Sequence, residues 1–244
     1  MALILVTGTG TGLGQASARE LIDLGHDVVL HARTSDRLRE QSIRDRAYAA
    51  VHGDLADLDA TVDLAGRLNR IGTFDAVIHN AGVLNGPDVF AVNIVAPYVL
   101  SALMTPPSRT VTLSSSMHLT GSAELEALDF ARPQDRRRPY DDSKLHVTAL
   151  AMALARLRPN ALAHAVDPGW VPTRMGGPHA SDDLDEGHRT QVWLATADAD
   201  EIAPRSGGYW HHRGAGRPHP AAVDAEFQRA LMERLAAHAG VTFS

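Results

Sequence analysis

The sequence predicts a three-layer α/β/α protein in which a doubly wound parallel sheet is covered by helices on both faces. Short apolar runs alternate with longer amphipathic stretches along most of the 244 residues, and this alternation is typical of βαβ units. The runs are apolar throughout rather than at every second position, as expected for strands buried on both faces. A glycine-rich segment, residues 7–14, joins the first run to the first amphipathic stretch. Together these features indicate a Rossmann-like fold.

Strands and helices are expected in alternation up to residue 169. We expect strands at residues 3–8, 27–32, 47–51, 74–82, 109–115 and 161–169. Between them we expect helices at residues 12–25, 34–45, 57–70, 88–103 and 140–157. Gly25, Gly72 and Pro159 mark three helix ends, because glycine leaves the helical conformation easily and proline lacks a backbone donor.

Two segments break this alternation, residues 117–139 and 171–187. Both are rich in proline, glycine and charge, so we expect loops over the carboxyl edge of the sheet, where open α/β sheets bind ligands. The acidic run 181–186 is expected to begin a helix, with Ser181 or Asp182 as its cap. We expect residues 1–244 to form one domain.

The composition narrows the class of partner. With 44% hydrophobic and 21% charged residues the chain is typical of a globular protein, and no apolar run reaches the roughly 20 residues that span a bilayer. The net charge of −6 argues against nucleic acid, whose recognition requires a basic surface. The chain has no cysteine, and its apolar start lacks the basic region of a secretion signal. We therefore expect a cytoplasmic protein with a small-molecule partner and no membrane contact.

The segment TGTGTGLG places Gly8, Gly12 and Gly14 between the first strand and the first helix. Glycine there lets the backbone turn tightly and approach a pyrophosphate, whose charge is favoured by the helix N-terminus. The alternative is a plain glycine-rich turn, because short glycine patterns occur by chance. The position directly after the first strand favours dinucleotide binding.

The end of the second strand is where a dinucleotide site binds the adenosine ribose. An acidic residue there would bind the 2′-hydroxyl of NAD, but the chain has Ala32 followed by Arg33. A guanidinium pairs with phosphate in a forked geometry, so we expect NADP rather than NAD, with Arg33 as the main ligand and Thr34 beside it. The alternative for Arg33 is a solvated loop residue. Asp54 is expected to bind the adenine amino group, to cap the next helix, or to do both.

Lys144 is the only lysine in the chain, and it follows Tyr140 by four residues at the start of a predicted helix. This spacing puts both side chains on one face. Lowering the pKa of a phenol from about 10 to about 7 takes roughly 4 kcal/mol, which one unit charge about 4 Å away supplies at an effective dielectric constant of about 20. We therefore expect Lys144 to make Tyr140 a proton donor at neutral pH. A compact ammonium can also hold two ribose hydroxyls, whereas a planar guanidinium is too bulky.

Six motifs, taken in order, resemble those of the short-chain dehydrogenase/reductase family. They are TGTGTGLG, HNAG at 79–82, VN at 92–93, LSSS at 113–116, YDDSK at 140–144 and DPGWVPT at 167–173. The resemblance covers nearly the whole chain, and residues 206–235 are similar to the retinol-dehydrogenase-like branch. It implies an NADP-dependent oxidoreductase that transfers a hydride between nicotinamide and a carbonyl or alcohol.

The resemblance implies a catalytic tetrad of Asn93, Ser115, Tyr140 and Lys144. Ser115 would bind the substrate carbonyl while Tyr140 donates a proton. Asn93 would bend its helix and hold a water that links the lysine to solvent. Without the other motifs, Asn93 would be interpreted as an exposed helix residue and residues 114–116 as a polar strand end.

The resemblance also implies the residues that contact the cofactor. They are Gly8, Thr11, Gly12, Leu13, Gly14, Arg33, Thr34, Asp54, Leu55, Asn80, Ala81, Gly82, Tyr140, Lys144, Pro168, Gly169, Val171 and Thr173. The family usually has asparagine where His79 stands. Pro168 and Gly169 could instead form a simple turn, and Thr173 could cap the lid.

The stretch between residues 83 and 109 is shorter than the family pattern on both sides of Asn93. In the family, the helices that carry the asparagine and the tyrosine commonly form the contact between subunits. We therefore expect a monomer or an altered dimer rather than a homodimer through the usual helical interface.

The substrate is expected to be a lipophilic carbonyl or alcohol. Its predicted contacts are Ser115, Met117, Tyr140 and Trp170, in a pocket that also includes Leu84, His118 and Met175. The alternative function is a catalytically silent NADP-binding sensor or scaffold with the same fold. An epimerase or dehydratase would need a larger C-terminal substrate domain.

Two further groups of residues are expected to carry no function. The thirteen histidines lack the i, i+4 spacing with an acidic third ligand that a zinc helix shows, so we expect no metal site. The three arginines at 136–138 could attract an anionic ligand, but a solvated loop is the expected interpretation.

Overall fold

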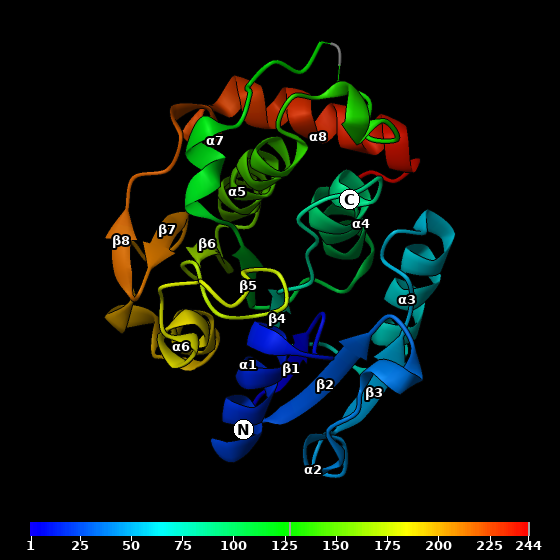
Figure 1. Cartoon of the computed structure of the whole chain (residues 1–244), viewed down its shortest axis with the longest axis vertical. Coiled ribbons are helices and arrows are strands. Elements are labelled where there is room, and N and C mark those ends of the chain that lie inside the picture. The colour runs from blue at the N-terminus through cyan, green and yellow to red at the C-terminus, as the bar shows by residue number, and fades with distance from the viewer. Residues whose placement is uncertain (127, 244) are drawn as a thin grey trace.

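The computed structural model describes residues 1–126 and 128–243 and contains, within them, one sheet with the strand order β3-β2-β1-β4-β5-β6-β7-β8 (Figure 1). The strands are β1 (Leu3–Val6), β2 (Asp27–Ala32), β3 (Ala49–His52), β4 (Ala76–His79), β5 (Arg109–Leu113), β6 (Leu162–Asp167), β7 (Gly208–His211) and β8 (Gly214–Gly216). All neighbouring pairs from β3 to β7 are parallel, and β8 pairs antiparallel with β7. The order reverses between β1 and β4, which is where a doubly wound sheet opens a ligand crevice. The predicted fold class is confirmed.

Helices cover both faces of the sheet (Figure 1). They are α1 (Gly12–Asp23), α2 (Gln41–Arg44), α3 (Leu58–Ile71), α4 (Ala96–Leu103), α5 (Pro139–Leu157), α6 (Leu184–Thr196), α7 (Pro220–Val223) and α8 (Ala225–Ala239). Five short turns of 3-10 or π type complete the elements: η1 (Ser35–Arg37), η2 (Ala91–Val95), η3 (Ser116–Thr120), η4 (Pro133–Asp135) and η5 (Ala199–Glu201). None of the helices in the described ranges is long and apolar enough to cross a bilayer.

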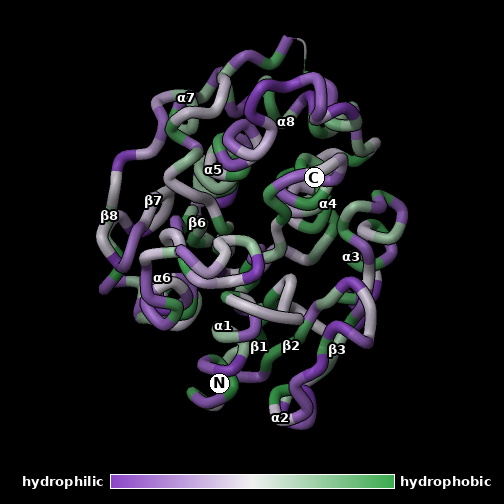
Figure 2. The backbone as a smooth tube through the Cα atoms, viewed as in Figure 1, coloured by the Kyte–Doolittle hydropathy of each residue, from purple (hydrophilic) through white to green (hydrophobic). Residues whose placement is uncertain are grey.

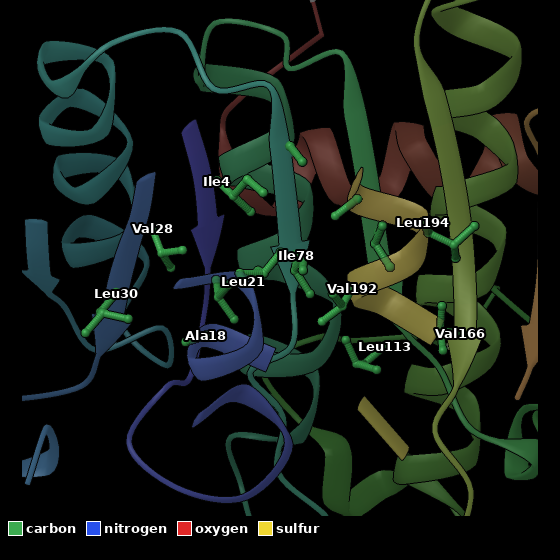
Figure 3. Close-up of a cluster of buried hydrophobic side chains, with 14 of the residues drawn as sticks. Ile4, Ala18, Leu21, Val28, Leu30, Ile78, Leu113, Val166, Val192 and Leu194 are labelled. Carbon is green, nitrogen blue, oxygen red and sulfur yellow. The ribbon is translucent and has the colours of Figure 1, made fainter. Parts of the chain in front are cut away.

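The core lies on both faces of the sheet because alternate strand residues point to opposite sides. On β1, Ile4 packs into the cluster beneath α1 and α6, where Figure 3 shows it near Leu21 and Ile78. Its neighbour Leu5 packs into the opposite cluster with Leu64 of α3. Burial on both faces explains why the strands are apolar throughout. In Figure 2 the strand β2 is accordingly mostly green, the colour of hydrophobic residues, whereas the chain around α2 is mostly purple, the colour of hydrophilic residues.

Two parts of the predicted element list are wrong. The single helix expected at 34–45 is broken into η1 and α2, because Leu38 and Ile43 both enter the core and an i, i+5 pair cannot share one helix face. Strands β7 and β8 were not predicted, since they are short and contain glycine and histidine rather than β-branched residues. Pairing with β6 stabilises β7 despite this composition.

Helix α5 is enclosed within the chain. Its residues from Asp141 to Leu154 are all buried, and α7 and α8 pack against it (Figure 1). The segment after α8 continues over α4, where the Tyr98 hydroxyl donates to the Val241 carbonyl at 2.8 Å and its ring lies 5.2 Å from that of Phe243. The C-terminal part of the chain therefore covers α4 and α5.

Candidate active site

A cavity of about 600 Å³ lies at the carboxyl ends of the central strands, beside the start of α5. This volume is within the range of small-molecule and cofactor sites. The predicted ligands on its wall are Gly8, Thr11, Gly12, Leu13, Gly14, Arg33, Asp54, Leu55, Asn80, Ala81, Gly82, Tyr140, Lys144, Pro168 and Thr173. Thr34, Gly169 and Val171, which were also predicted, lie outside this wall. The wall further includes His31 and Arg174, to which no motif pointed.

A contact from the residue that follows β4 fixes the glycine-rich turn between β1 and α1. Gly8 and Gly12 have φ angles of 73° and 62°, which glycine adopts without strain. A Cβ atom on Gly14 would collide with the Asn80 amide and the Gly8 carbonyl. The Asn80 amide donates to the Thr7 carbonyl at 2.9 Å, which fixes the turn. Thr11, the residue before α1, makes no side-chain cap, so its side chain leaves the first N–H groups of the helix free for an anion.

His31 ties this turn to two strands. Its Nδ1 accepts from the Gly8 N–H at 3.3 Å, so Nε2 carries the proton and donates to the Gly53 carbonyl at 3.0 Å. Burial lowers the pKa of His31 to about 4, which keeps the ring neutral. The only sequence signal for this role is an imidazole in an otherwise apolar strand.

Arg33 and Asp54 face each other at the adenosine end of the cavity. The Arg33 Nε lies 3.5 Å from Asp54 Oδ1, and both side chains are about half exposed. The alternative in which Asp54 caps α3 is wrong, because Asp57 is the cap and accepts from the Ala60 N–H at 3.0 Å. Asp54 instead accepts from the Ala56 N–H at 3.0 Å. Thr34 is exposed and hydrogen-bonds Asp36.

Tyr140 and Lys144 lie on one face of the first turns of α5. Lys144 is only 4% exposed, and its Nζ donates to the Leu113 carbonyl at 2.7 Å. The same nitrogen lies 5.5 Å from the centroid of the Tyr140 ring. The Tyr140 hydroxyl lies 4.0 Å from the Met175 sulfur. Met175 belongs to the loop at residues 171–187, called the second loop below, so this loop covers the hydroxyl.

The expected acidification of the phenol by Lys144 is not found in this arrangement. Burial raises the pKa of Tyr140 to about 12, although its hydrogen bond with Ser115 acts in the opposite direction. Burial also lowers the pKa of Lys144 to about 8, against the attraction of Asp167. The physical reason is that the ammonium hydrogen-bonds a backbone carbonyl and faces the ring of Tyr140, while both groups lose hydration.

The three adjacent serines have different environments. The Ser114 hydroxyl is buried against Thr148 at 2.6 Å, and Ser116 begins η3. Ser115 acts on the phenol, because hydrogen bonding by its hydroxyl opposes the rise in the pKa of Tyr140, and this hydroxyl accepts from the Met117 N–H at 3.2 Å. Ser115 itself lies off the cavity wall, which Ser114 reaches.

His118 was expected on the pocket wall, and this is wrong. It is fully buried, and both ring nitrogens are used inside the protein. Nε2 accepts from the His219 N–H at 3.0 Å, and Nδ1 donates to the Ser115 carbonyl at 2.7 Å. Leu84 and Met175 lie on the wall as expected, but Met117 and Trp170 do not. Both are exposed, at 45% and 54%. They present apolar surface to solvent rather than to the cavity.

Asn93 connects three segments rather than lying exposed on a helix. It sits in the π-type turn η2 and is buried. Its Oδ1 accepts from the Val83 N–H at 2.8 Å, while Nδ2 donates to the Val83 carbonyl at 2.9 Å and to the Ser143 hydroxyl at 3.0 Å. Both amide hydrogens are therefore used in fixing the start of α5. The water-holding role stays a prediction.

The second loop is closed at its base by Trp170 and Asp182. The Trp170 N–H donates to Asp182 Oδ2 at 2.6 Å, and the Asp182 N–H returns a bond to the Trp170 carbonyl at 2.9 Å. The predicted caps Ser181 and Asp182 are both wrong, because Asp183 caps α6 by accepting from two backbone N–H groups. Thr173 does not cap this helix either and accepts from the Gly176 N–H at 3.2 Å.

The remaining polar groups are structural. His79 is buried with Nε2 3.3 Å from the Ser101 hydroxyl. Arg136 is not solvated as expected, since it forms a 2.7 Å ion pair with Asp142 in which both side chains are nearly buried. Nowhere in residues 1–126 and 128–243 do three His, Asp or Glu side chains gather as metal ligands would.

Comparison with known proteins gives consistent matches. A family model described as short chain dehydrogenase matches residues 2–107. The chain is 35% identical to the short-chain dehydrogenase chyC of Penicillium rubens over 96% of this chain and 95% of that protein. It is 27% identical to human retinol dehydrogenase 13, over 93% of this chain and 81% of that protein.

Solved structures share the fold. A protein from Mycobacterium paratuberculosis superposes with a TM-score of 0.81 at 24% identity, over all of this chain and 95% of the other. An NADPH-bound carbonyl reductase from chicken fatty liver has a TM-score of 0.70 at 20% identity, over 89% of this chain and 99% of the other.

Proposed function

Because the chain belongs to the short-chain dehydrogenase/reductase family, we propose that it is an NADP-dependent oxidoreductase acting on a carbonyl or alcohol group. The observation that carries the proposal is that Tyr140 and Lys144 share one cavity with the glycine turn and Arg33. A dinucleotide needs an anion site at one end and proton chemistry at the other. The carbonyl reductase and other relatives of this fold that bind NADPH or NADP support the choice of cofactor. The absence of cysteine favours the cytoplasm.

The residues present fit such a cofactor. Gly8, Gly12 and Gly14 line the cavity, and a Cβ atom on these glycines would crowd Ala81, Thr173 and Asn80, respectively. Within residues 1–126 and 128–243, Arg33 forms one ion pair, the loose contact with Asp54, so its guanidinium is available for a phosphate. When bound, the cofactor supplies or accepts the hydride.

The chain supplies the proton and orients the substrate. Ser115 would donate a hydrogen bond to the substrate carbonyl oxygen, and Tyr140 would give that oxygen its proton. Lys144 would hold the ribose hydroxyls with its remaining donors. The Met175 thioether must leave the Tyr140 hydroxyl when a substrate enters. The apolar side chains of Leu84 and Met175 on the cavity wall support a lipophilic substrate.

The test is a screen of aldehydes, ketones and alcohols with the purified protein, followed by the absorbance of reduced nicotinamide. We expect NADPH consumption with apolar carbonyl compounds. Tight NADPH binding without turnover of any compound would favour the sensor or scaffold instead. Failure to bind NADPH and NADH would contradict both functions.

Arg33→Ala is expected to weaken NADPH binding about 10- to 100-fold, since one charge-assisted phosphate contact contributes about 1.5–3 kcal/mol. Binding of NADH should change little, because it has no 2′-phosphate. Nicotinamide fluorescence measures both dissociation constants. Arg37→Ala is the control, because Arg37 is exposed in the same segment but lies off the cavity wall. Equal losses for NADPH and NADH would contradict this role.

We also propose that the protein is a monomer. The outer faces of α4 and α5, which carry the usual subunit contact of the family, are covered by α7, α8 and the segment around Phe243. Light scattering after gel filtration should give about 26.1 kDa, the mass of one chain. A stable mass of twice this value would show that another surface pairs.

A further inference from the structure

The buried ammonium of Lys144 has no nearby ion pair. Its hydrogen bond to the Leu113 carbonyl is with a neutral group, and no carboxylate lies within 4.0 Å of its Nζ in the described residues. An ionised amine at 4% exposure loses most of its hydration, which costs several kcal/mol unless another charge compensates. The role given to Lys144 in the proposed function requires it to stay charged. A compensating charge is therefore needed.

Asp167 lies where it can supply the charge that compensates the Lys144 ammonium. It is the last residue of β6, and its neighbour Val166 pairs with Leu113, whose carbonyl holds the ammonium. Asp167 is itself only 6% exposed. A second buried charge thus lies at the adjoining end of the next strand.

Two hydrogen bonds from uncharged donors fix the position of the Asp167 carboxylate. Oδ1 accepts from the Gly169 N–H at 3.0 Å, and Oδ2 accepts from the Tyr209 hydroxyl at 3.2 Å. Both donors are neutral. Two histidine rings lie around it: His211 Nδ1 is 3.8 Å from Oδ2 and about half exposed, and the buried His118 packs against the ring of Tyr209.

The other carboxylates around the site are already engaged. On α5, Asp141 lies 3.7 Å from Arg138 and accepts from the Thr120 hydroxyl at 2.7 Å, and Asp142 is paired with Arg136. In the second loop, Asp182 accepts the Trp170 N–H. The uncharged Tyr140 ring also faces the ammonium, which lies 5.5 Å from its centroid.

We propose that Asp167 is the counter-charge that keeps Lys144 ionised inside the protein, and is thereby a positioning residue for the reaction. It acts through Lys144 and touches neither substrate nor cofactor in this role, which rests on the proposed function. The pKa values support the placement. Burial lowers the pKa of Lys144 to about 8, and the one opposing influence is Asp167. Asp167 also acts to raise the pKa values of His118 on η3 and Tyr209 on β7, as expected of a negative charge among these elements.

A direct test is available because Lys144 is the only lysine in the chain. Protein grown with isotope-labelled lysine gives one lysine side-chain NMR signal, and its shift against pH reports the ionisation of Lys144 without any substrate. The wild-type midpoint is expected near pH 8. In Asp167→Asn, which keeps the shape and the acceptor for Gly169, we expect the midpoint to move down by about one unit, as for the loss of a charge several ångströms away. An unchanged midpoint would overturn the proposal.

Two further variants separate charge from structure. Tyr209→Phe removes the hydrogen bond to Asp167 but leaves the charge, so the Lys144 midpoint should stay within a few tenths of a unit of the wild type. An equal shift in this variant would assign the effect to packing and overturn the proposal. Asp167→Ser, a smaller neutral residue, replaces Asp167→Asn if the latter does not fold, and the same downward shift is expected.

Kinetics distinguish this inference from the proposed function. In Asp167→Asn, the loss of activity at alkaline pH should begin at a lower pH, because Lys144 gives up its proton earlier. If the wild-type protein turns over no carbonyl compound, the proposed function fails, but the NMR midpoints still decide whether Asp167 sustains the charge. If turnover is normal and the midpoints coincide, only the role of Asp167 fails.

Discussion

Tyr140→Phe is expected to reduce kcat for carbonyl reduction by about 10²- to 10⁴-fold, which is the usual contribution of one positioned proton donor. The substitution removes one hydroxyl and leaves the ring that packs beneath Lys144. No other described phenol lines the cavity. Steady-state kinetics with NADPH and the best substrate of the screen measure the effect.

Binding provides the control for this loss. The dissociation constant for NADPH should change much less than kcat in Tyr140→Phe, because the phosphate contacts are untouched. Tyr48→Phe removes an exposed hydroxyl and should leave both quantities unchanged. A Tyr140→Phe protein with more than about a tenth of the parent kcat would contradict a proton-donor role.

Lys144→Met is expected to cause a comparable loss and also to weaken cofactor binding, since the ammonium is removed from the cavity. Lys144→Arg keeps the charge but should not restore activity, because a planar guanidinium cannot fit the space between Leu113 and the Tyr140 ring without displacing them. Full activity of Lys144→Arg would mean that charge alone suffices.

The local parts of the site were predictable from the sequence, and the distant contacts were not. The glycine turn and the pair Tyr140 and Lys144 are each encoded within eight residues, so spacing alone indicates them. His31 and Asp167 act through partners more than 20 residues away along the chain. No periodicity or motif reports such a contact. The strands from β1 to β6 were predicted for a related reason, because continuous apolar runs are a local signal.

The spacing of Tyr140 and Lys144 predicted the wrong direction for the pKa of the Tyr140 phenol. Four residues place Tyr140 and Lys144 on one face, but spacing gives neither the degree of burial nor the direction of the ammonium donors. Burial disfavours the charged form of both groups, so the pKa of Tyr140 rises to about 12 instead of falling. Such desolvation depends on residues that are distant in sequence, such as Met175 beside the phenol hydroxyl and Leu113 at the ammonium.

Mild acid is expected to unfold the protein through four buried histidines. Burial lowers the pKa values of His31, His79 and His164 to about 4, and that of His146 to about 3, from the ordinary value of 6.5. As pH falls below 6.5, the unfolded chain binds a proton on each ring, while the folded protein binds none until about pH 4. Stability is therefore complete above pH 6.5 and is lost as pH falls through the window down to about 4.

The expected size of this effect is large. Four protons taken up on unfolding give a slope of roughly 5 kcal/mol per pH unit near pH 5.5, at 1.36 kcal/mol for each proton. A domain with about 5–15 kcal/mol of stability would lose most of it between pH 6.5 and pH 4.5. Guanidinium denaturation at several pH values measures the slope. A free energy of unfolding that is constant from pH 7 to pH 5 would contradict the prediction.

His146→Leu tests one of these protons in isolation. Both ring nitrogens of His146 are buried without a hydrogen-bond partner among the described residues, and Phe90, Phe130 and Phe227 surround the ring. An apolar side chain of similar size removes two unsatisfied polar atoms from this site, so the variant should be more stable than the parent at pH 7 by about 1–3 kcal/mol. It should also unfold with one proton fewer, which lowers the slope near pH 5.5 by about a quarter. His179→Gln, at an exposed position, should change neither quantity. An unchanged slope in His146→Leu would show that this ring is already protonated in the folded protein.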